Sequence, residues 1–218
     1  MSLLIYAESS EGKFKKVAFE LASYAKKVAE SLGTTVTAVT VNNNNVSDLS
    51  KYGVDKVLKV ANDKLSNFSA KAYADLIVKA AQKENSKIVL LSSTTDSLYL
   101  APLVAVGLDA GFASNVIGLP VNMSPFQVKR SAFSNKAFNI TEIETDTKVL
   151  ALAKNSFGIV ENQSSLSEEN FEPTLTDADF NIKIESVEKG SGKVTIADAD
   201  VVVSGGRGLK GPENWGML

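Results

Sequence analysis

The fold is decided by the stretch LLIYAESSEGKFKKVAFELASYAKKVAESLGTTVTAVTV, residues 3–41. It begins with a short apolar run and ends with a β-branched run, TVTAVTV (35–41), and both are typical of buried strands. Between them, apolar residues recur at the spacing of a helix, at Val17, Leu21, Tyr24, Val28 and Leu32. Gly33 supplies a C-terminal stop for that helix. This order of elements predicts a βαβ unit with two parallel strands.

The same alternation continues towards residue 111. It predicts a short helix (46–53), a strand (54–60), a helix (69–84) and a strand with a continuous apolar run, KIVLLSS (87–93). We expect Pro102 in the first turn of the next helix, which ends near Gly111. Right-handed crossovers place helices on both faces of a parallel sheet. The pattern therefore predicts an α/β fold, a Rossmann-like three-layer αβα arrangement with a mainly parallel sheet.

The pattern changes after residue 114. Four strand-like segments follow in close succession, at 114–122, 126–133, 136–144 and 147–153. The connections are too short for helices, and the polar triplets SNK (134–136) and TDT (145–147) suit hairpin turns. We expect this region to form an antiparallel extension of the sheet.

The remaining sequence predicts a connection to a second domain. Residues 161–189 are acidic and contain few large apolar side chains, which favours a solvated linker over a docking strip for a partner. The glycines and serine of EKGSGK (188–193) are typical of a hinge, and ADVVVS (199–204) predicts a new strand. We therefore expect an α/β domain at 1–160, an acidic linker and hinge at 161–192, and the start of a further domain at 193–218.

Composition limits the possible functions. The chain has 218 residues, of which 44% are hydrophobic, and it carries a net charge of −2, as expected for an ordinary globular protein that does not bind nucleic acid. No apolar run is long enough to cross a membrane, and the N-terminus lacks the parts of a signal peptide. We therefore expect a cytoplasmic protein without direct membrane insertion.

The chain contains no cysteine and no histidine. This excludes disulfides, metal sites built on thiolate or imidazole, cysteine nucleophiles and histidine bases. Acidic residues show no clustering of the type that binds calcium, and neither a GxSxG elbow nor a Walker-type loop occurs. We therefore expect neither catalytic residues nor a metal site, and a hydrolase or transferase is disfavoured.

The last eighteen positions, VVVSGGRGLKGPENWGML (201–218), read as a strand, a glycine-rich turn and the start of a helix. Proteins build phosphate cradles from these parts, because the turn lets backbone N–H groups approach the anion. A glycine turn that merely joins two elements is the alternative, since short glycine motifs recur by chance.

Three segments resemble the alpha subunit of electron-transfer flavoprotein: ADVVVSGGRGLKGPENW (199–215), LAPLVAVGLDAG (100–111) and KRSAF…VLALAKNSF (129–157). The first is similar to the start of that subunit's flavin-binding domain, and the others to its N-terminal domain. The resemblance implies an electron carrier, not an enzyme. Such a carrier takes electrons from acyl-CoA or other dehydrogenases onto FAD and passes them to a quinone oxidoreductase or another acceptor. It also implies a beta subunit as partner, which holds AMP where AMP is present.

Only one part of the flavin site has a counterpart in this sequence. Arg207 matches the family's FAD-contacting arginine, and Gly205, Gly206 and Gly208 match the glycines beside it. Because the other segments of that site lie beyond position 218, the resemblance implies FAD in the full-length protein and not on residues 1–218 alone. Leu103 and Asn115 stand where relatives have an arginine and an aspartate. Polar contacts at a subunit interface or hinge are therefore in doubt at these two positions.

A stand-alone adenine-nucleotide-binding α/β module is the alternative, with its ligand at the carboxyl ends of the first four strands. Only Gly12 follows the first strand where such modules carry a glycine-rich fingerprint. The run NNNN (42–45) would line a polar pocket there, or form a surface loop. The lysines of EGKFKK (11–16) would bind an anionic partner, or they belong to a basic turn exposed to solvent. We also expect the apolar tail to dock on a sheet edge or to pair with another copy.

Overall fold

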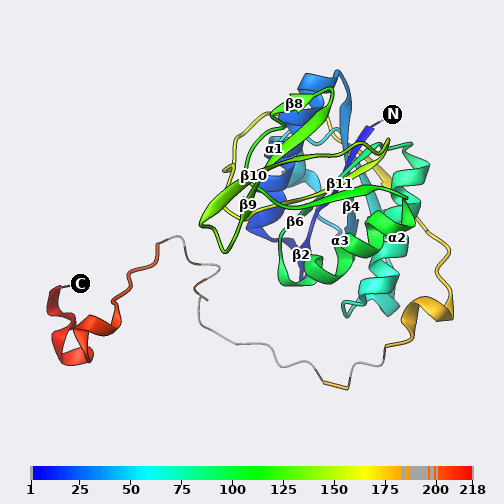
Figure 1. Cartoon of the computed structure of the whole chain (residues 1–218). Coiled ribbons are helices and arrows are strands. Elements are labelled where there is room, and N and C mark those ends of the chain that lie inside the picture. Colours follow the sequence, from blue (N-terminus) through cyan, green and yellow to red (C-terminus); the bar gives the residue numbers. More distant parts are fainter. Residues whose placement is uncertain (1, 183–184, 187–195, 197–198, 200, 218) are drawn as a thin grey trace. The chain divides into compact units, whose positions relative to one another are not determined.

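A ten-stranded sheet organises the first of two units in the computed structural model, which describes residues 2–182, 185–186, 196, 199 and 201–217 (Figure 1). The first unit is Met1–Lys183 and the second Ile184–Leu218. The strands lie in the order β10 (Ala137–Glu142), β9 (Phe126–Ala132), β7 (Gly111–Val116), β11 (Lys148–Leu152), β6 (Ile88–Ser92), β1 (Ser2–Tyr6), β4 (Thr35–Val41), β5 (Lys56–Val60) and β12 (Ser167–Asn170). β8 (Asn122–Met123) pairs with β9, and β2 (Ser9–Ser10) pairs with β3 (Lys13–Phe14) in a separate ribbon.

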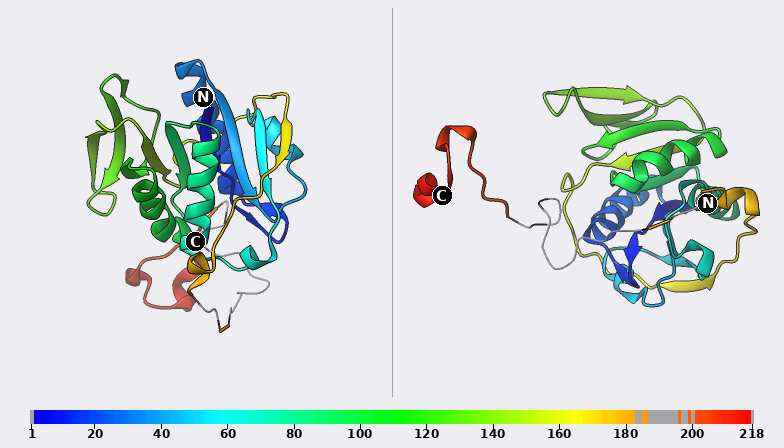
Figure 2. Two further views of the ribbon diagram at one scale, coloured as in Figure 1. Left: turned by 90° about the vertical axis from the view of Figure 1, so that its right-hand side faces the viewer. Right: turned by 90° about the horizontal axis from the view of Figure 1, so that it is seen from below.

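Helices cover both faces of the parallel part, as Figure 2 shows. α1 (Lys16–Leu32) packs on one face with Leu3 and Ile5 of β1, whereas α2 (Ala70–Lys83) and α3 (Thr95–Gly107) pack on the other with Leu4. Successive side chains of a strand point to opposite faces, so the fully buried β1 contributes to both cores. The predicted three-layer α/β fold is therefore confirmed.

The antiparallel extension is confirmed in part. β9 and β10 form the hairpin predicted at SNK (134–136). The hairpin expected at TDT (145–147) is wrong, because that turn leads to β11, which lies between β7 and β6 and is parallel to both. The reason lies in the apolar run of β11: Val149 and Leu150 are both fully buried, which requires cover on both faces of the sheet.

Pro102 lies in the interior of α3 and not in its first turn, so that prediction was wrong. The helix begins earlier, because the Thr94 side chain accepts a hydrogen bond from the backbone N–H of Ser97 and caps it. It also ends earlier, at Gly107. A Cβ on Gly107 would lie 2.7 Å from Cγ2 of Val78, so the missing side chain lets α2 and α3 approach closely.

Residues 161–180 run along the first unit, where the sequence predicted a solvated linker. They contribute the edge strand β12, which pairs with β5, and a 3₁₀ helix, η3 (Asp177–Phe180). The same unit contains two further 3₁₀ helices, η1 (Ser47–Lys51) and η2 (Asp63–Leu65). The predicted hinge at 188–193 lies outside the described residues.

The second unit contains two 3₁₀ helices, η4 (Arg207–Leu209) and η5 (Pro212–Met217). The strand predicted at 199–204 is not formed in its described residues, 199 and 201–204. Val201 and Val203 are 81% and 70% exposed, as expected for an apolar segment without neighbouring strands to bond. Docking of this tail on a sheet edge or on another copy stays a prediction.

Candidate functional site

The outer face of α3 is apolar and uncovered. Its inner residues Leu100, Ala101 and Val104 are buried in the core, yet Leu98, Tyr99, Leu103 and Val106 are 67%, 67%, 43% and 81% exposed. A helix that is apolar on all sides is normally buried on all sides. Four large exposed apolar residues on one helix therefore indicate a surface that another molecule covers.

The β9–β10 hairpin extends this apolar character. Phe138 and Ile140 of β10 are 65% and 50% exposed. Val128 belongs to the core on the α1 side and lies opposite Thr141, so the alternate positions Phe138 and Ile140 face the side of the sheet that α2 and α3 cover. The Lys129 ammonium group lies 4.2 Å from the ring centroid of Phe138 on that same side.

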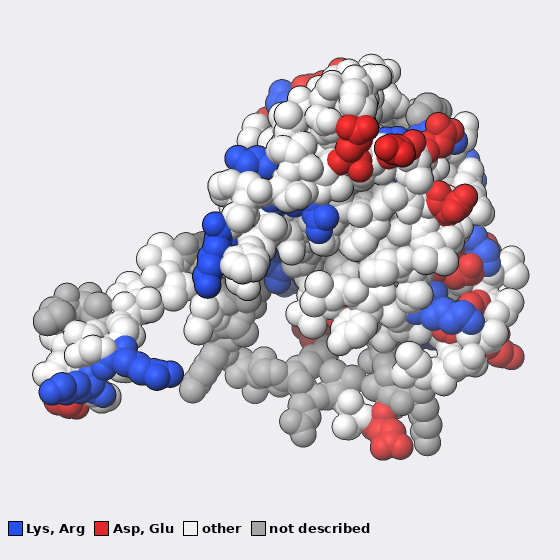
Figure 3. Space-filling view, viewed as in Figure 1, with Lys and Arg blue, Asp and Glu red and all other residues white. Residues whose placement is uncertain are grey.

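We call these side chains the α3–hairpin surface: Leu98, Tyr99, Leu103, Val106, Phe138 and Ile140. Figure 3 shows a broad area without charged side chains where α3 lies, and lysine and arginine side chains towards the hairpin. The surface can bury apolar area against a partner, and the phenol of Tyr99 is the one ionisable group among its six side chains.

Leu103, where the resemblance leads us to expect an arginine, belongs to this surface. Asn115 lies at the end of β7 with φ 53°, a left-handed conformation that asparagine tolerates, and it is exposed. These two positions therefore lie on the α3–hairpin surface and near the end of β7, outside the buried core.

The carboxyl edge of the parallel sheet is the second candidate. β1 lies between β4 and β6, and the chain runs first to β4 and β5 on one side and then to β6 on the other. Open α/β sheets bind ligands at such a reversal of strand order. The loops that follow β1, β4, β5 and β6 all end at this edge.

Glu8, directly after β1, makes its bonds within the chain. It is 3% exposed and accepts hydrogen bonds from Thr94 Oγ1 at 2.7 Å and from Lys15 Nζ at 3.0 Å. Lys15 thus neutralises a carboxylate of its own chain. The polar groups at the β1–β6 reversal therefore join the start of α1 to the start of α3.

We expect Glu8→Gln to lower the free energy of unfolding by about 1–2 kcal/mol, because the amide loses the ion pair and presents a donor to hydroxyl groups. Chemical denaturation followed by circular dichroism measures this. Glu144→Gln is the control, because that side chain is exposed and should change stability by less than about 0.5 kcal/mol. Equal effects of the two substitutions would contradict a structural role for Glu8.

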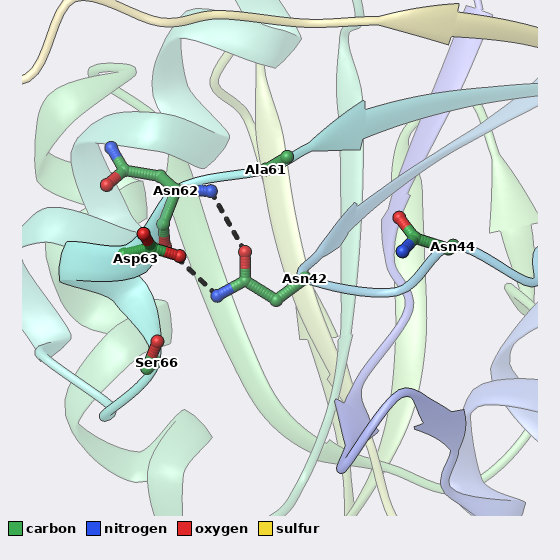
Figure 4. Close-up of a pocket in the computed structure, with 6 residues that line it drawn as sticks. All are labelled: Asn42, Asn44, Ala61, Asn62, Asp63 and Ser66. Carbon is green, nitrogen blue, oxygen red and sulfur yellow. Dashed lines mark hydrogen bonds between the residues drawn. The ribbon is translucent and has the colours of Figure 1, made fainter.

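A polar cavity of about 410 Å³ lies beside the ends of β4 and β5 (Figure 4) and is lined by Asn42, Asn44, Ala61, Asn62, Asp63 and Ser66. The NNNN run thus does line a pocket. The amide of Asn42 is already engaged, since it donates to the Asn62 carbonyl at 3.0 Å and accepts from the Asn62 N–H at 2.9 Å. No lysine or arginine lines the cavity and Asp63 adds negative charge, so it does not favour a phosphate group.

Gly205, Gly206, Arg207 and Gly208, the residues predicted to contact FAD, lie in the second unit and are exposed. Arg207 begins the three-residue helix η4, and Gly206 precedes it in an extended conformation. Their role stays a prediction. Among the described residues, no group of acidic side chains could hold a metal, and no helix is long and apolar enough to cross a membrane.

The exposed apolar α3–hairpin surface was missed by the sequence reasoning. The segment TDSLYLAPLVAVG carries the only signal for it, because its apolar residues occupy every side of the helix instead of one stripe.

Comparison with known proteins places the chain. The family model for the electron transfer flavoprotein domain matches residues 3–178. The electron transfer flavoprotein subunit alpha of Thermoanaerobacterium thermosaccharolyticum is 28% identical over 98% of this chain, and that of Clostridium acetobutylicum is likewise 28% identical over 98%. The subunit of the same name from Syntrophomonas wolfei is 30% identical over 96%. The chain spans about two thirds of these relatives, at 67%, 67% and 66% of their lengths. The chain therefore belongs to the electron transfer flavoprotein family.

Proposed function

We propose that this chain is the platform part of an electron transfer flavoprotein alpha subunit, which pairs with a beta-type subunit through the α3–hairpin surface. The observation that carries the proposal is the outer face of α3, where Val106 is 81% exposed on a helix without a polar side. Relatives named as alpha subunits over nearly the whole chain support it further. The chain itself contributes docking and no catalytic groups.

FAD is the proposed cofactor of the full-length protein, where it would accept and release electrons. The glycine turn fits a phosphate-bearing group in two respects. A Cβ on Gly206 or Gly208 would meet no atom within 4 Å, so the backbone is open to a ligand. Arg207 makes no ion pair with any described residue, which leaves its guanidinium group available to an anion. These residues would hold one part of FAD.

Co-expression of the full-length subunit with the beta-type subunit of the same genome tests the proposal. We expect the two chains to copurify in equal amounts with a yellow flavin absorbance. Mixing with an acyl-CoA dehydrogenase and its substrate should then bleach that absorbance, and a quinone oxidoreductase together with oxidised quinone should restore it. Absence of both copurification and bound flavin would overturn the proposal. The cytoplasmic location stays a prediction.

A further inference from the structure

Residues 161–180, which we call the acidic strap, are held along the edge of the sheet by backbone hydrogen bonds. The N–H of Asn162 donates to the Lys51 carbonyl at 2.7 Å, and that of Ser164 to the Ser50 carbonyl at 2.9 Å. Further on, the N–H of Phe171 donates to the carbonyl of Lys59 at 2.8 Å. The strap therefore follows η1 and β5 in a fixed register.

Two successive glutamates clamp the strap on both faces of the sheet. Glu168 contacts the Lys59 ammonium group at 2.8 Å. Glu169 points to the opposite face, where it contacts Lys56 of β5 and Lys83 of α2, each at 2.7 Å. One carboxylate thus joins a strand and a helix that are distant in the sequence.

A second attachment lies at the end of the strap. The Asp179 carboxylate accepts hydrogen bonds from the N–H and hydroxyl of Thr176 at 2.8 and 2.9 Å and lies 3.5 Å from the Lys71 ammonium group of α2. These bonds and that charge hold the pKa of Asp179 below its usual value.

Apolar burial contributes less to the strap than to the rest of the sheet. Its large apolar side chains are only partly buried against the core: Leu166, Phe171, Leu175 and Phe180. By contrast, Leu58 of the neighbouring strand β5 is completely buried. An isolated surface ion pair contributes little to stability, whereas several charges that form a network contribute more. The strap therefore depends on ion pairs more than its neighbours do.

We infer that the acidic strap is an electrostatic latch, which detaches from β5 and α2 when its ion pairs are screened or removed while the remaining sheet stays folded. Detachment opens the edge of β5 and adds residues 161–180 to the connection that leads to the second unit. A longer connection lowers the effective concentration that one unit experiences of the other. This last consequence rests on the proposed function, whereas the latch does not.

Salt, more than pH, controls such a latch. Hydrogen bonds from Lys56 and Lys83 lower the pKa of Glu169 to about 2, and Glu84 on α2 also contacts Lys56, at 2.8 Å. A carboxyl group with a lowered pKa contributes stability above its unfolded value of 4.5 and loses it as the pH falls towards 2. The latch thus holds at neutral and mildly acidic pH. At about 1 M salt, however, the Debye length shrinks to about 3 Å.

Hydrogen exchange of the backbone amides tests the inference. In Glu169→Gln we expect the amides of Ser167 and Phe171, which donate to the carbonyls of Asp55 and Lys59, to exchange about fivefold faster, because two ion pairs are lost. Peptides from β1 and β6 should exchange at the wild-type rate. Raising the salt to about 1 M should accelerate the strap of the wild type by a similar factor and that of the variant less.

Glu172→Gln is the matched control, because it makes the same change of charge in the same strap. Glu172 is exposed and makes no ion pair with a described residue, so its substitution should leave strap exchange within about twofold of the wild type. The latch is overturned if both variants behave alike. It is equally overturned if Glu169→Gln accelerates β1 and β6 as much as the strap, since the glutamate would then stabilise the whole fold.

Discussion

Replacing Val106 with glutamate is expected to weaken association with the beta-type subunit by at least about a hundredfold. The side chain is 81% exposed in the isolated chain, on the outer face of α3 among Leu103 and Tyr99. In a complex, the new carboxylate would be buried against apolar groups without a partner, and loss of about 2.7 kcal/mol or more corresponds to that factor. Bio-layer interferometry between the purified subunits measures the dissociation constant directly.

Because Val106 is exposed in the isolated chain, a change in affinity can be attributed to the interface and not to unfolding. Since Val106 contributes little to the core, the variant should unfold at the same denaturant concentration as the wild type. Ser31→Glu is the matched control, because it places a carboxylate at an exposed position of α1, on the opposite face of the sheet. It should leave the dissociation constant within about twofold. Equal binding by wild type and Val106→Glu would remove α3 from the interface.

The parallel core could be predicted from the sequence because each element carries its own periodic signal. β1, β4 and β6 are short apolar or β-branched runs, and α1 has an apolar stripe of helical spacing that ends at Gly33. β11 was assigned to the wrong part of the sheet because its neighbours were judged from loop length. Its own composition pointed to the centre: the apolar run VLAL is buried along its whole length, whereas β10 is exposed at every position except the half-buried Thr141.

The α3–hairpin surface and the acidic strap could not be predicted in the same way. The apolar sequence of α3 predicts that the helix is buried. It does not show, however, whether each face of the helix is covered by the chain's own core or by another molecule. The strap was taken for a solvated linker because its acidic residues look unpaired in sequence. Their lysines, at positions 56, 59 and 83, are close only after the sheet has formed. The proposed flavin contacts around Arg207 rest on resemblance, and the fold of the first unit does not bear on them.

Glu20→Ala is expected to lower the free energy of unfolding by about 4 kcal/mol, the largest effect on stability that we anticipate in the first unit. Glu20 lies on α1, is 4% exposed, and binds the segment that leaves β11. One carboxylate oxygen accepts from the N–H groups of Phe157 at 2.9 Å and Gly158 at 3.0 Å, and the other from Asn155 at 2.9 Å. Alanine would leave these three N–H groups without their acceptor.

Two further variants separate the hydrogen bonds from other effects of the substitution. Glu20→Gln keeps one acceptor oxygen but turns an NH₂ group towards a backbone N–H, so it should lose about half as much stability. Glu30→Ala, at an exposed position of the same helix, should change it by less than about 1 kcal/mol. Circular dichroism is the appropriate probe, because the single tryptophan, Trp215, belongs to the second unit. A loss below about 1 kcal/mol in Glu20→Ala would mean that water replaces the carboxylate as acceptor for these three N–H groups.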